Sequence, residues 1–369
     1  MGERPWTQIA TVDDLEKKLK SRIFGQNHIV EEVVNTLKVS MAGLSDESKP
    51  IASFLFTGPT GVGKTEFAIE LAKNLGVHFE RFDMSEYADE YSARNLTGGQ
   101  KGLVGYEDGG LLTNAVKENP ECVLLLDEIE KADRAVYNTF LQVLDYGTLK
   151  DTQGNTADFT KTVIIMTSNL GSNEKRGIGF ADNTDIYKES AVADFLSPEF
   201  RNRLDNILEF NKLTGDMIIH ITDKFLEDLG SRLLEKNIFL SISGEAKEHL
   251  NTIGFESAMG ARSISRAINS EFKRHISQEI LFGSLKDGGT VCITLGKDGF
   301  VYDFRSGHRH TDVPEGIDAG CDFKTAEEAC RYAKENVGVT VTKSPSGHGY
   351  IIKDRHTSKK KQNASKNIS

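Results

Sequence analysis

The sequence predicts an α/β protein with a large parallel-sheet domain followed by a smaller domain rich in helices. Over the first 210 residues, short apolar runs alternate with segments whose apolar residues recur at helical spacing. This alternation is typical of parallel strands joined by crossover helices. Beyond residue 211 helical spacing dominates, over Asp216–Asn237, Gly244–Ile253 and a stretch from Gly260 to about Leu281. A hairpin is expected over 290–304.

The composition bounds the class of protein. The chain has 369 residues, 38% hydrophobic and 27% charged, which is typical of a globular protein of several domains. No apolar run is long enough to span a bilayer and the first residues contain no apolar signal region, so we expect a cytoplasmic protein without a membrane partner. A net charge of −10 argues against general nucleic-acid binding. Four scattered cysteines favour a reducing compartment.

Residues 1–50 are expected to form amphipathic helices, with Leu15, Leu19 and Ile23 sharing one face. Gly25 interrupts the helical pattern just after Ile23 and Phe24. Apolar side chains at this point, ahead of the first strand, suit either packing against a nucleotide base or ordinary core packing.

A glycine-rich run follows the apolar strand Phe54–Thr57 and opens a helix that ends near Leu75. It has the G-x-x-x-x-G-K-[ST] pattern, in which glycines let backbone amides turn inward around phosphate at a helix N-terminus. Lys64 is expected to reach the β and γ phosphates and Thr65 to place its hydroxyl on Mg²⁺. We therefore predict that the chain binds a nucleotide, with Mg²⁺ on Thr65. The loop residues are Gly58, Pro59, Thr60, Gly61, Val62, Gly63, Lys64 and Thr65.

Acidic residues end a later strand. After a second strand over His78–Asp83, the apolar run Val123–Leu126 is followed directly by Asp127 and Glu128. Behind a phosphate loop, such a pair is suited to hold Mg²⁺ through Asp127 and to polarise the attacking water through Glu128. The same pair also suits the N-terminus of the helix expected over 131–144.

The fourth strand, Val163–Asn169, ends in a polar tip. Asn169 falls at the edge of the sheet where ligands bind in open α/β folds, and its amide is suited to orient water against a phosphate. Alternatively, it is an asparagine that initiates a turn. A short helix starting at Pro198 and a fifth strand over Ile207–Phe210 complete the large domain.

Two loops present apolar side chains. The glycine-dense segment 98–110 carries Leu103, Val104 and Tyr106, which indicates either a mobile loop that binds a partner or a plain surface loop. Residues 171–190 are mainly polar, and within them lies one apolar cluster, Ile178–Phe180, which includes Gly179. An apolar cluster in a polar loop is suited to insert into a hydrophobic pocket of a partner.

Together and in this order, these residues resemble an AAA+ ATPase of the Clp unfoldase family, closest to the second, C-terminal ATPase module of ClpA. The resemblance covers roughly residues 18–304. The stretches that carry it are Ser53–Glu66, Arg81–Tyr87, Leu124–Ala132, Pro198–Asn206 and Ala258–Arg262. It implies an AAA+ large subdomain over 1–210 and a small lid subdomain over 211–304. The family's adaptor domain and first module have no counterpart, so a single-ring protein or an isolated module is expected.

The resemblance also implies roles for single residues. It makes Lys64 and Thr65 the Walker A pair, Asp127 and Glu128 the Walker B pair, and Asn169 sensor 1.

Two arginines and one apolar segment gain roles in the same way. Arg203, in Phe-Arg-Asn-Arg-Leu-Asp, matches the arginine finger that reaches a neighbouring subunit's γ-phosphate, which implies a homo-hexamer. Arg262 matches sensor 2, which couples nucleotide state to the angle between subdomains. The segment from Ile23 to Gln26, with Phe24, matches the segment beside the adenine.

The family also suggests roles for the two loops. Ile178, Gly179 and Phe180 match the tripeptide with which protease-binding members dock on a ClpP-like peptidase. The pore loop departs from the family's Gly-aromatic-Val-Gly, because Leu103 replaces the ring that grips substrate and offers less area. Tyr106 lies nearby in sequence and is a candidate to share that role.

Residues 305–353 have no parallel in the family and suggest a small α/β appendage. A helix is expected over Phe323–Ala333, and strands over Val339–Lys343 and Gly349–Ile352. A basic, disordered tail is expected over 354–369. Two histidines and two cysteines in this region have no zinc-like spacing, so reduced, unligated cysteines are expected. They are His308, His310, Cys321 and Cys330.

The leading hypothesis is an ATPase that unfolds and translocates protein substrates through a ring into a ClpP-like peptidase, with an adaptor left open. The alternative is a protease-independent chaperone that remodels protein assemblies, a reading that Leu103 and the C-terminal extension keep open. A non-hydrolysing scaffold is disfavoured, because every catalytic position carries the expected residue type.

Overall fold

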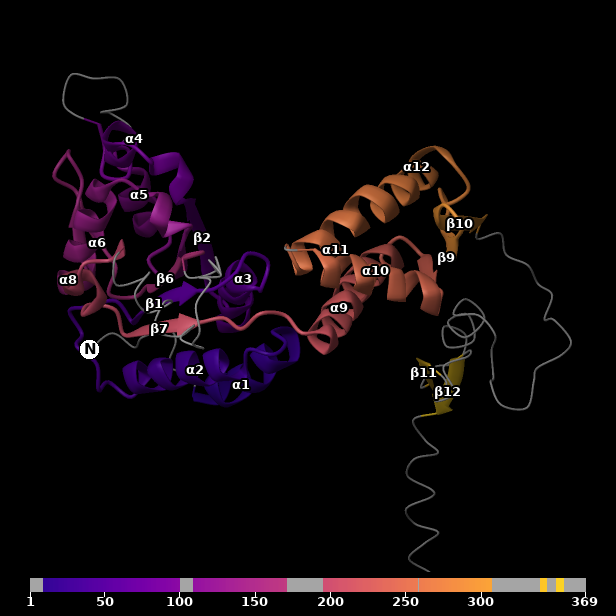
Figure 1. Cartoon of the computed structure of the whole chain (residues 1–369). Helices are drawn as coiled ribbons and strands as arrows, with labels where there is room; N and C mark the ends of the chain where they lie inside the picture. Colours follow the sequence, from indigo (N-terminus) through magenta and orange to yellow (C-terminus); the bar gives the residue numbers. More distant parts are fainter. Residues whose placement is uncertain are drawn as a thin grey trace, which may run out of the picture. The chain divides into compact units, whose positions relative to one another are not determined.

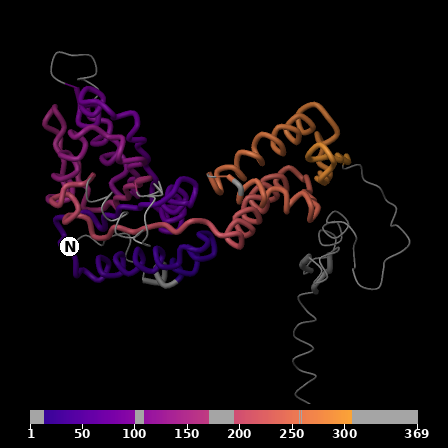
Figure 2. The backbone as a smooth tube through the Cα atoms, viewed as in Figure 1, coloured from indigo at the N-terminus to yellow at the C-terminus, as the bar shows by residue number. Residues whose placement is uncertain are grey.

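The computed structural model describes residues 9–99, 109–170, 195–257, 259–306, 339–343 and 350–354. The chain separates into two compact units, traced in Figure 2. One unit comprises Met1–Ile218 with Ala258–Ala261, and the other comprises Ile219–Ser257 with Arg262–Ser369.

The first unit is built on a sheet of five parallel strands in the order β2-β3-β6-β1-β7 (Figure 1). The strands are β1 (Ala52–Thr57), β2 (His78–Asp83), β3 (Cys122–Asp127), β6 (Val163–Thr167) and β7 (Asn206–Glu209). All five strands expected from the sequence are present, and the predicted parallel α/β fold is confirmed. The order places β1, which leads into the glycine-rich loop, in the interior of the sheet, next to β6 and β7.

Helices cover both faces of this sheet (Figure 1). They are α1 (Ile9–Arg22), α2 (Asn27–Met41), α3 (Lys64–Leu75), α4 (Glu90–Arg94), α5 (Leu111–Glu118), α6 (Arg134–Tyr146) and α8 (Pro198–Arg201). The 3₁₀ turns η2 (Met84–Tyr87) and η3 (Ile129–Lys131) and a hairpin of β4 (Thr148–Lys150) and β5 (Thr156–Asp158) connect them. Alternation along β1 divides the core, since Phe54 and Phe56 pack with α1–α3 whereas Leu55 packs with α5 and α6.

The helix expected over 131–144 begins later than expected and continues further, over Arg134–Tyr146. Its start is set by Asp133, whose side chain accepts a hydrogen bond from the Ala135 amide and so caps the first turn. The residues before it form the separate turn η3, which leaves Glu128 outside any helix. This placement frees the carboxylate to face the site described below.

Phe67 anchors the helix behind the glycine-rich loop to the sheet. It is fully buried, and its ring centroid lies 5.2 Å from that of Phe56 and 6.0 Å from that of Phe210. We expect Phe67→Ala to lower the free energy of unfolding by about 3–5 kcal/mol, because the cavity lies between helix and sheet. Urea denaturation of the full chain, followed by circular dichroism, measures this change.

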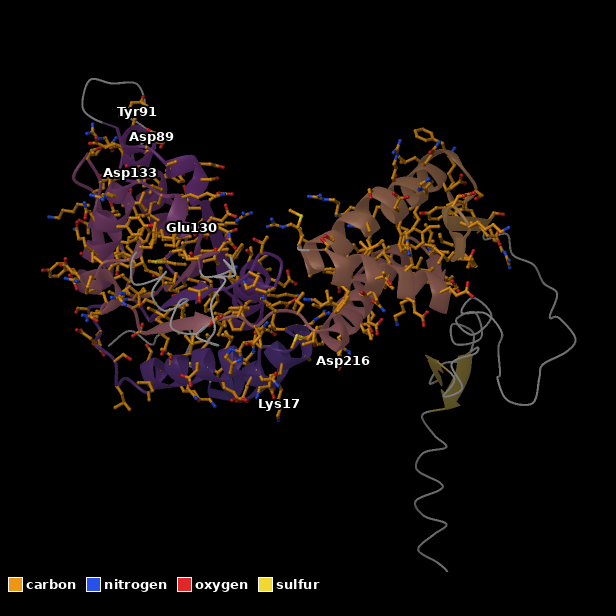
Figure 3. All side chains as sticks on the ribbon, viewed as in Figure 1. Lys17, Asp89, Tyr91, Glu130, Asp133 and Asp216 are labelled. Carbon is orange, nitrogen blue, oxygen red and sulfur yellow. The ribbon has the colours of Figure 1, made fainter. Side chains whose placement is uncertain are left out.

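The matched control for this substitution is Tyr91→Ala. Tyr91 lies on α4 at the outer edge of the first unit (Figure 3) and is 68% exposed. Its truncation is expected to change the free energy of unfolding by less than about 0.5 kcal/mol. Equal losses in the two variants would contradict an anchoring role for Phe67.

The second unit combines helices with a three-stranded sheet in the order β10-β9-β8. Its elements are α9 (Gly215–Leu234) from Ile219 onward, β8 (Ile238–Ile242), α10 (Gly244–Glu256), α11 (Ala261–Ala267) from Arg262 onward, α12 (Arg274–Phe282), β9 (Gly289–Gly296) and β10 (Gly299–Ser306). The expected hairpin is confirmed by the antiparallel pairing of β9 with β10. The helix expected from residue 260 is interrupted by a π turn, η4 (Ile268–Lys273). Among the described residues, no helix is long and apolar enough to cross a membrane.

The C-terminal strands expected from the sequence are also present. β11 (Val339–Lys343) and β12 (Tyr350–Asp354) pair antiparallel, with Val341 opposite Ile352. The expected helix over 323–333, the tail beyond Asp354, and the histidines and cysteines at 308, 310, 321 and 330 lie outside the described residues.

Candidate functional site

The glycine-rich loop turns through backbone conformations that only glycine adopts easily. Gly58, Gly61 and Gly63 have φ of 128°, 80° and 107°. A Cβ on Gly61 would lie 2.0 Å from the Met259 carbonyl oxygen, and one on Gly58 would lie 2.7 Å from that of Phe210. Glycine is therefore required here both for the turn and for close approach of other backbone.

Lys64, the first residue of α3, lies inside this loop and is only 7% exposed. Its ammonium donates to the carbonyl oxygens of Gly58 and Pro59, at 2.6 and 2.8 Å, and to Asn169 Oδ1 at 3.0 Å. These contacts hold a positive charge beside the amides at the start of α3, where an anion is most favourably bound. The predicted contact of Lys64 with a phosphate remains a prediction.

The carboxyl ends of neighbouring strands bring Asp127 and Thr65 together. Thr65 Oγ1 lies 3.4 Å from both carboxylate oxygens of Asp127, the last residue of β3. Thr167, the last residue of β6, donates a hydrogen bond from its hydroxyl to Asp127 Oδ1 at 2.5 Å. The same hydroxyl accepts a hydrogen bond from the Glu128 backbone amide at 3.0 Å. A hydroxyl and a carboxylate that converge here form a set of hard oxygen donors of the kind that Mg²⁺ prefers.

Asn169 links the lysine of the loop to Glu128. Its Oδ1 accepts from Lys64, as described, and its Nδ2 donates to Glu128 Oε1 at 3.3 Å. Glu128 adopts a left-handed backbone conformation, with φ of 59° and ψ of 50°, which is uncommon for a residue other than glycine and is found at functional sites. Its other carboxylate oxygen pairs with the Lys131 ammonium, and this hydrogen bond raises the pKa of Lys131.

The structure therefore brings together five of the residues that the sequence singled out: Lys64, Thr65, Asp127, Glu128 and Asn169. They come from α3, from the end of β3 and from the segment after β6, and all of them lie at one edge of the sheet. The contacts among them are observed, and the catalytic roles that the sequence suggested remain predictions.

Arg203 makes a separate set of contacts. Its Nε donates to Asp145 Oδ1 at 2.6 Å, Nη1 donates to the Glu199 carbonyl at 2.8 Å, and Nη2 pairs with the Glu199 carboxylate at 3.1 Å. These bonds, that to Asp145 above all, raise the pKa of Arg203. The guanidinium is thus held by contacts within its own chain, and the structure does not place it with the residues around Lys64.

The remaining predicted residues lie elsewhere in the chain. Ile23 is 4% exposed and packs in the core beneath the sheet, so it is a core residue, and its contact with adenine stays a prediction, as does that of Phe24. Arg262 lies in α11, within the second unit. The pore-loop residues at 103, 104 and 106 and the docking tripeptide over 178–180 lie outside the described residues.

Several residues of this site were not singled out from the sequence. Thr167 and Arg81 contact the carboxylate of Asp127, and Lys131 contacts that of Glu128. Glu130 Oε1 accepts a hydrogen bond from the Asn169 backbone amide at 3.1 Å. Its Oε2 is buried without a hydrogen-bond partner in the described part of the chain. Figure 3 shows Glu130 within the first unit. Only Thr167 carried a usable signal, as the last residue of a strand ending at the same edge.

Comparison with known protein families agrees with this arrangement. Residues 49–207 match the family "AAA domain (Cdc48 subfamily)", and residues 213–293 match "C-terminal, D2-small domain, of ClpB protein". The chain carries an AAA+ module of the Clp family. The match to the AAA domain indicates an ATPase, and the two matches together confirm the resemblance recognised in the sequence.

Clp-family relatives align with most of this chain. The "ClpA homolog protein" of Fuscovulum blasticum is 42% identical over 294 residues, which are 79% of this chain and 37% of that protein. The "Chaperone protein ClpB" of Clostridium tetani is 45% identical over 288 residues, 76% of this chain and 33% of that protein. The "Chaperone protein ClpB" of Aquifex aeolicus is 42% identical over 301 residues, which are 78% of this chain and 30% of that protein. The chain thus spans about a third of the length of these curated relatives.

Proposed function

We propose that this Clp-family module hydrolyses ATP in a ring of identical subunits and uses the energy to unfold and translocate proteins. The observation that carries the proposal is the chain of contacts from Lys64 through Asn169 to Glu128, next to the pair formed by Thr65 and Asp127. A phosphate-binding cation, an amide, a general base and a set of oxygen donors adjoin one another at one edge of the sheet. These are the parts that phosphoryl transfer to water requires.

Each residue has a chemical task in this mechanism. The ammonium of Lys64 and the amides of the loop bind the phosphates, and Thr65 with Asp127 would hold Mg²⁺. Bound there, Mg²⁺ would neutralise charge on the phosphate oxygens. Glu128 accepts a proton from the attacking water, and Asn169 orients that water or the γ-phosphate. Because Asn169 contacts both Lys64 and Glu128, it links the phosphate-binding group to the general base.

A neighbouring subunit would complete the site. Arg203, the predicted arginine finger, pairs with Asp145 and Glu199 of its own chain. The proposed mechanism therefore takes the second positive charge at the γ-phosphate from a neighbouring subunit. Supplied in trans, an arginine stabilises transition-state charge and couples hydrolysis to assembly. We propose the closed ring to be a hexamer, as the family resemblance implies, with Arg262 coupling nucleotide state to the small subdomain.

Two candidate functions differ in what receives the unfolded chain. The tripeptide Ile178–Phe180 and the likeness to a ClpA homolog favour delivery to a ClpP-like peptidase. The several relatives named ClpB, and the match to a ClpB small domain, favour a chaperone that works without a peptidase. We take the first as the proposal, because an apolar tripeptide within a mainly polar stretch of sequence is what docking into a hydrophobic pocket requires.

A degradation assay tests this proposal. The full chain, ATP and a ClpP-like peptidase are mixed with a folded, tagged fluorescent protein, and loss of fluorescence is followed for wild type and Phe180→Ala. We expect Phe180→Ala to slow degradation by about tenfold or more while ATPase activity is retained, as for loss of an interface hot spot. The matched control is Ile186→Ala, an apolar residue of the same segment outside the tripeptide, which is expected to degrade substrate like wild type.

The second candidate has its own result in the same experiment. A wild-type chain that hydrolyses ATP and reactivates an aggregated protein, yet never supports degradation, would establish the peptidase-independent chaperone. Degradation that is unaffected by Phe180→Ala would show that the tripeptide does not dock the peptidase.

A further inference from the structure

Arg81 occupies a position beside the carboxylate assigned to Mg²⁺. It lies on β2, whose neighbour in the sheet is β3, and the register places Asp83 directly opposite Asp127. Arg81 and Asp83 are two residues apart, so their side chains leave the same face of the strand. Arg81 Nη2 lies 2.7 Å from Asp127 Oδ2 and 3.5 Å from Asp83 Oδ2.

Asp127 is fully engaged in this arrangement. Its Oδ1 accepts the Thr167 hydroxyl, both oxygens lie near Thr65, and Oδ2 is occupied by Arg81. The Asp127 side chain is only 11% exposed, whereas that of Arg81 is 46% exposed. A carboxylate removed from water needs a compensating charge, and here a half-exposed guanidinium supplies it.

Asp83 offers the guanidinium a second partner. Asp83 Oδ1 is held by Ser85, through the backbone amide at 3.1 Å and the hydroxyl at 2.6 Å, which leaves Oδ2 facing Arg81. The hydrogen bonds from Ser85 lower the pKa of Asp83, so its carboxylate is ionised at neutral pH. Arg81 thus stands between two carboxylates, bound closely to one and within reach of the other.

We propose that Arg81 is a stand-in cation for Asp127: it neutralises Asp127 while Mg²⁺ is absent and moves to Asp83 when Mg²⁺ takes its place. This inference rests on the proposed function, because it assigns Asp127 to the Mg²⁺ site. Arg81 is then a positioning residue that sets the Mg²⁺ concentration at which nucleotide binds tightly. It keeps Asp127 oriented between catalytic cycles, and it competes with the metal ion for Oδ2.

The test measures nucleotide affinity rather than turnover. The full chain is titrated with a fluorescent N-methylanthraniloyl-ADP, first in EDTA and then over a series of free Mg²⁺ concentrations. We expect Arg81→Gln to lower the half-saturating free Mg²⁺ concentration by about three- to tenfold, since loss of one partly exposed ion pair removes the competitor. Affinity in EDTA is expected to stay unchanged, because Arg81 contacts no residue of the phosphate loop among those described.

The controls separate competition from other roles of the arginine. Arg81→Lys keeps the positive charge and is expected to remain close to wild type. Arg94→Gln removes an exposed arginine paired with Glu90 on α4 and is expected to have no effect on the Mg²⁺ titration. If Arg81→Gln leaves the half-saturating concentration unchanged or raises it, the stand-in role is wrong. Failure of the wild type to bind the nucleotide at any Mg²⁺ concentration would instead refute the proposed ATPase.

Discussion

Replacing Glu128 by glutamine is expected to lower the rate of ATP hydrolysis by about 10²- to 10⁴-fold while ATP binding is retained. The substitution removes the group that accepts a proton from water and keeps the shape of the side chain. An amide at this position can still accept from Asn169, so the arrangement around Lys64 should persist. Phosphate release measures hydrolysis, and a fluorescent ATP analogue measures binding.

The left-handed backbone of Glu128 makes this expectation specific to one residue. A non-glycine residue held at φ of 59° carries strain. The surrounding structure offsets it by the hydrogen bond from the Glu128 backbone amide to the Thr167 hydroxyl and by the ion pair with Lys131. The carboxylate's other oxygen, Oε1, accepts from Asn169. Glu118→Gln, an exposed carboxylate at the end of α5, is the matched control and should hydrolyse ATP at the wild-type rate. Hydrolysis by Glu128→Gln at that same rate would exclude Glu128 as the base.

Much of the fold follows from local patterns, because a buried parallel strand is a continuous apolar run and each run here is bounded by turns. The β2 strand lies over the residues expected, and β3, β6 and β7 differ from expectation by one or two residues at their ends. The second unit contains a strand that local patterns do not predict. Ile238–Ile242 is strand β8, where no strand was expected, because five residues without alternation carry no period that distinguishes a strand from a helix end.

In the candidate site, the residues could be predicted from the sequence, whereas the contacts between them could not. Lys64 and Thr65 are recognisable because their loop is contiguous in sequence, and Asp127, Glu128 and Asn169 because each follows an apolar strand. Their contacts depend on strand order, which places β3 next to β6.

The pairs that sequence could not foresee are long-range ones. Arg203 is joined to Asp145 across 58 positions, and the pairing of Arg81 with Asp127 depends on the register between β2 and β3. No local spacing encodes such a pair, because it exists only once the sheet and the helices around it are packed.

Truncating Arg203 to alanine is expected to lower ATP hydrolysis by the assembled chain by about 10³- to 10⁵-fold. The guanidinium carries the charge that would stabilise the γ-phosphate of the neighbouring subunit, and Asp145 and Glu199 fix its orientation. Arg203→Lys should recover little activity, because an ammonium cannot reproduce the planar set of donors. Arg94→Ala, which removes an exposed arginine of α4, should leave the rate unchanged.

Mixing two inactive variants distinguishes a finger that acts in trans from one that acts within its own subunit. A ring assembled from equal amounts of Glu128→Gln and Arg203→Ala subunits contains, by random assembly, about a quarter of sites with an intact Glu128 and a neighbour's intact Arg203. Single-turnover phosphate release should then regain about that fraction of the wild-type amplitude. If Arg203 acted on its own subunit's nucleotide, no mixture would restore an intact site, and the amplitude would stay at the level of the separate variants. Because the guanidinium is held by Asp145 and Glu199 and not beside Lys64, we expect the recovery.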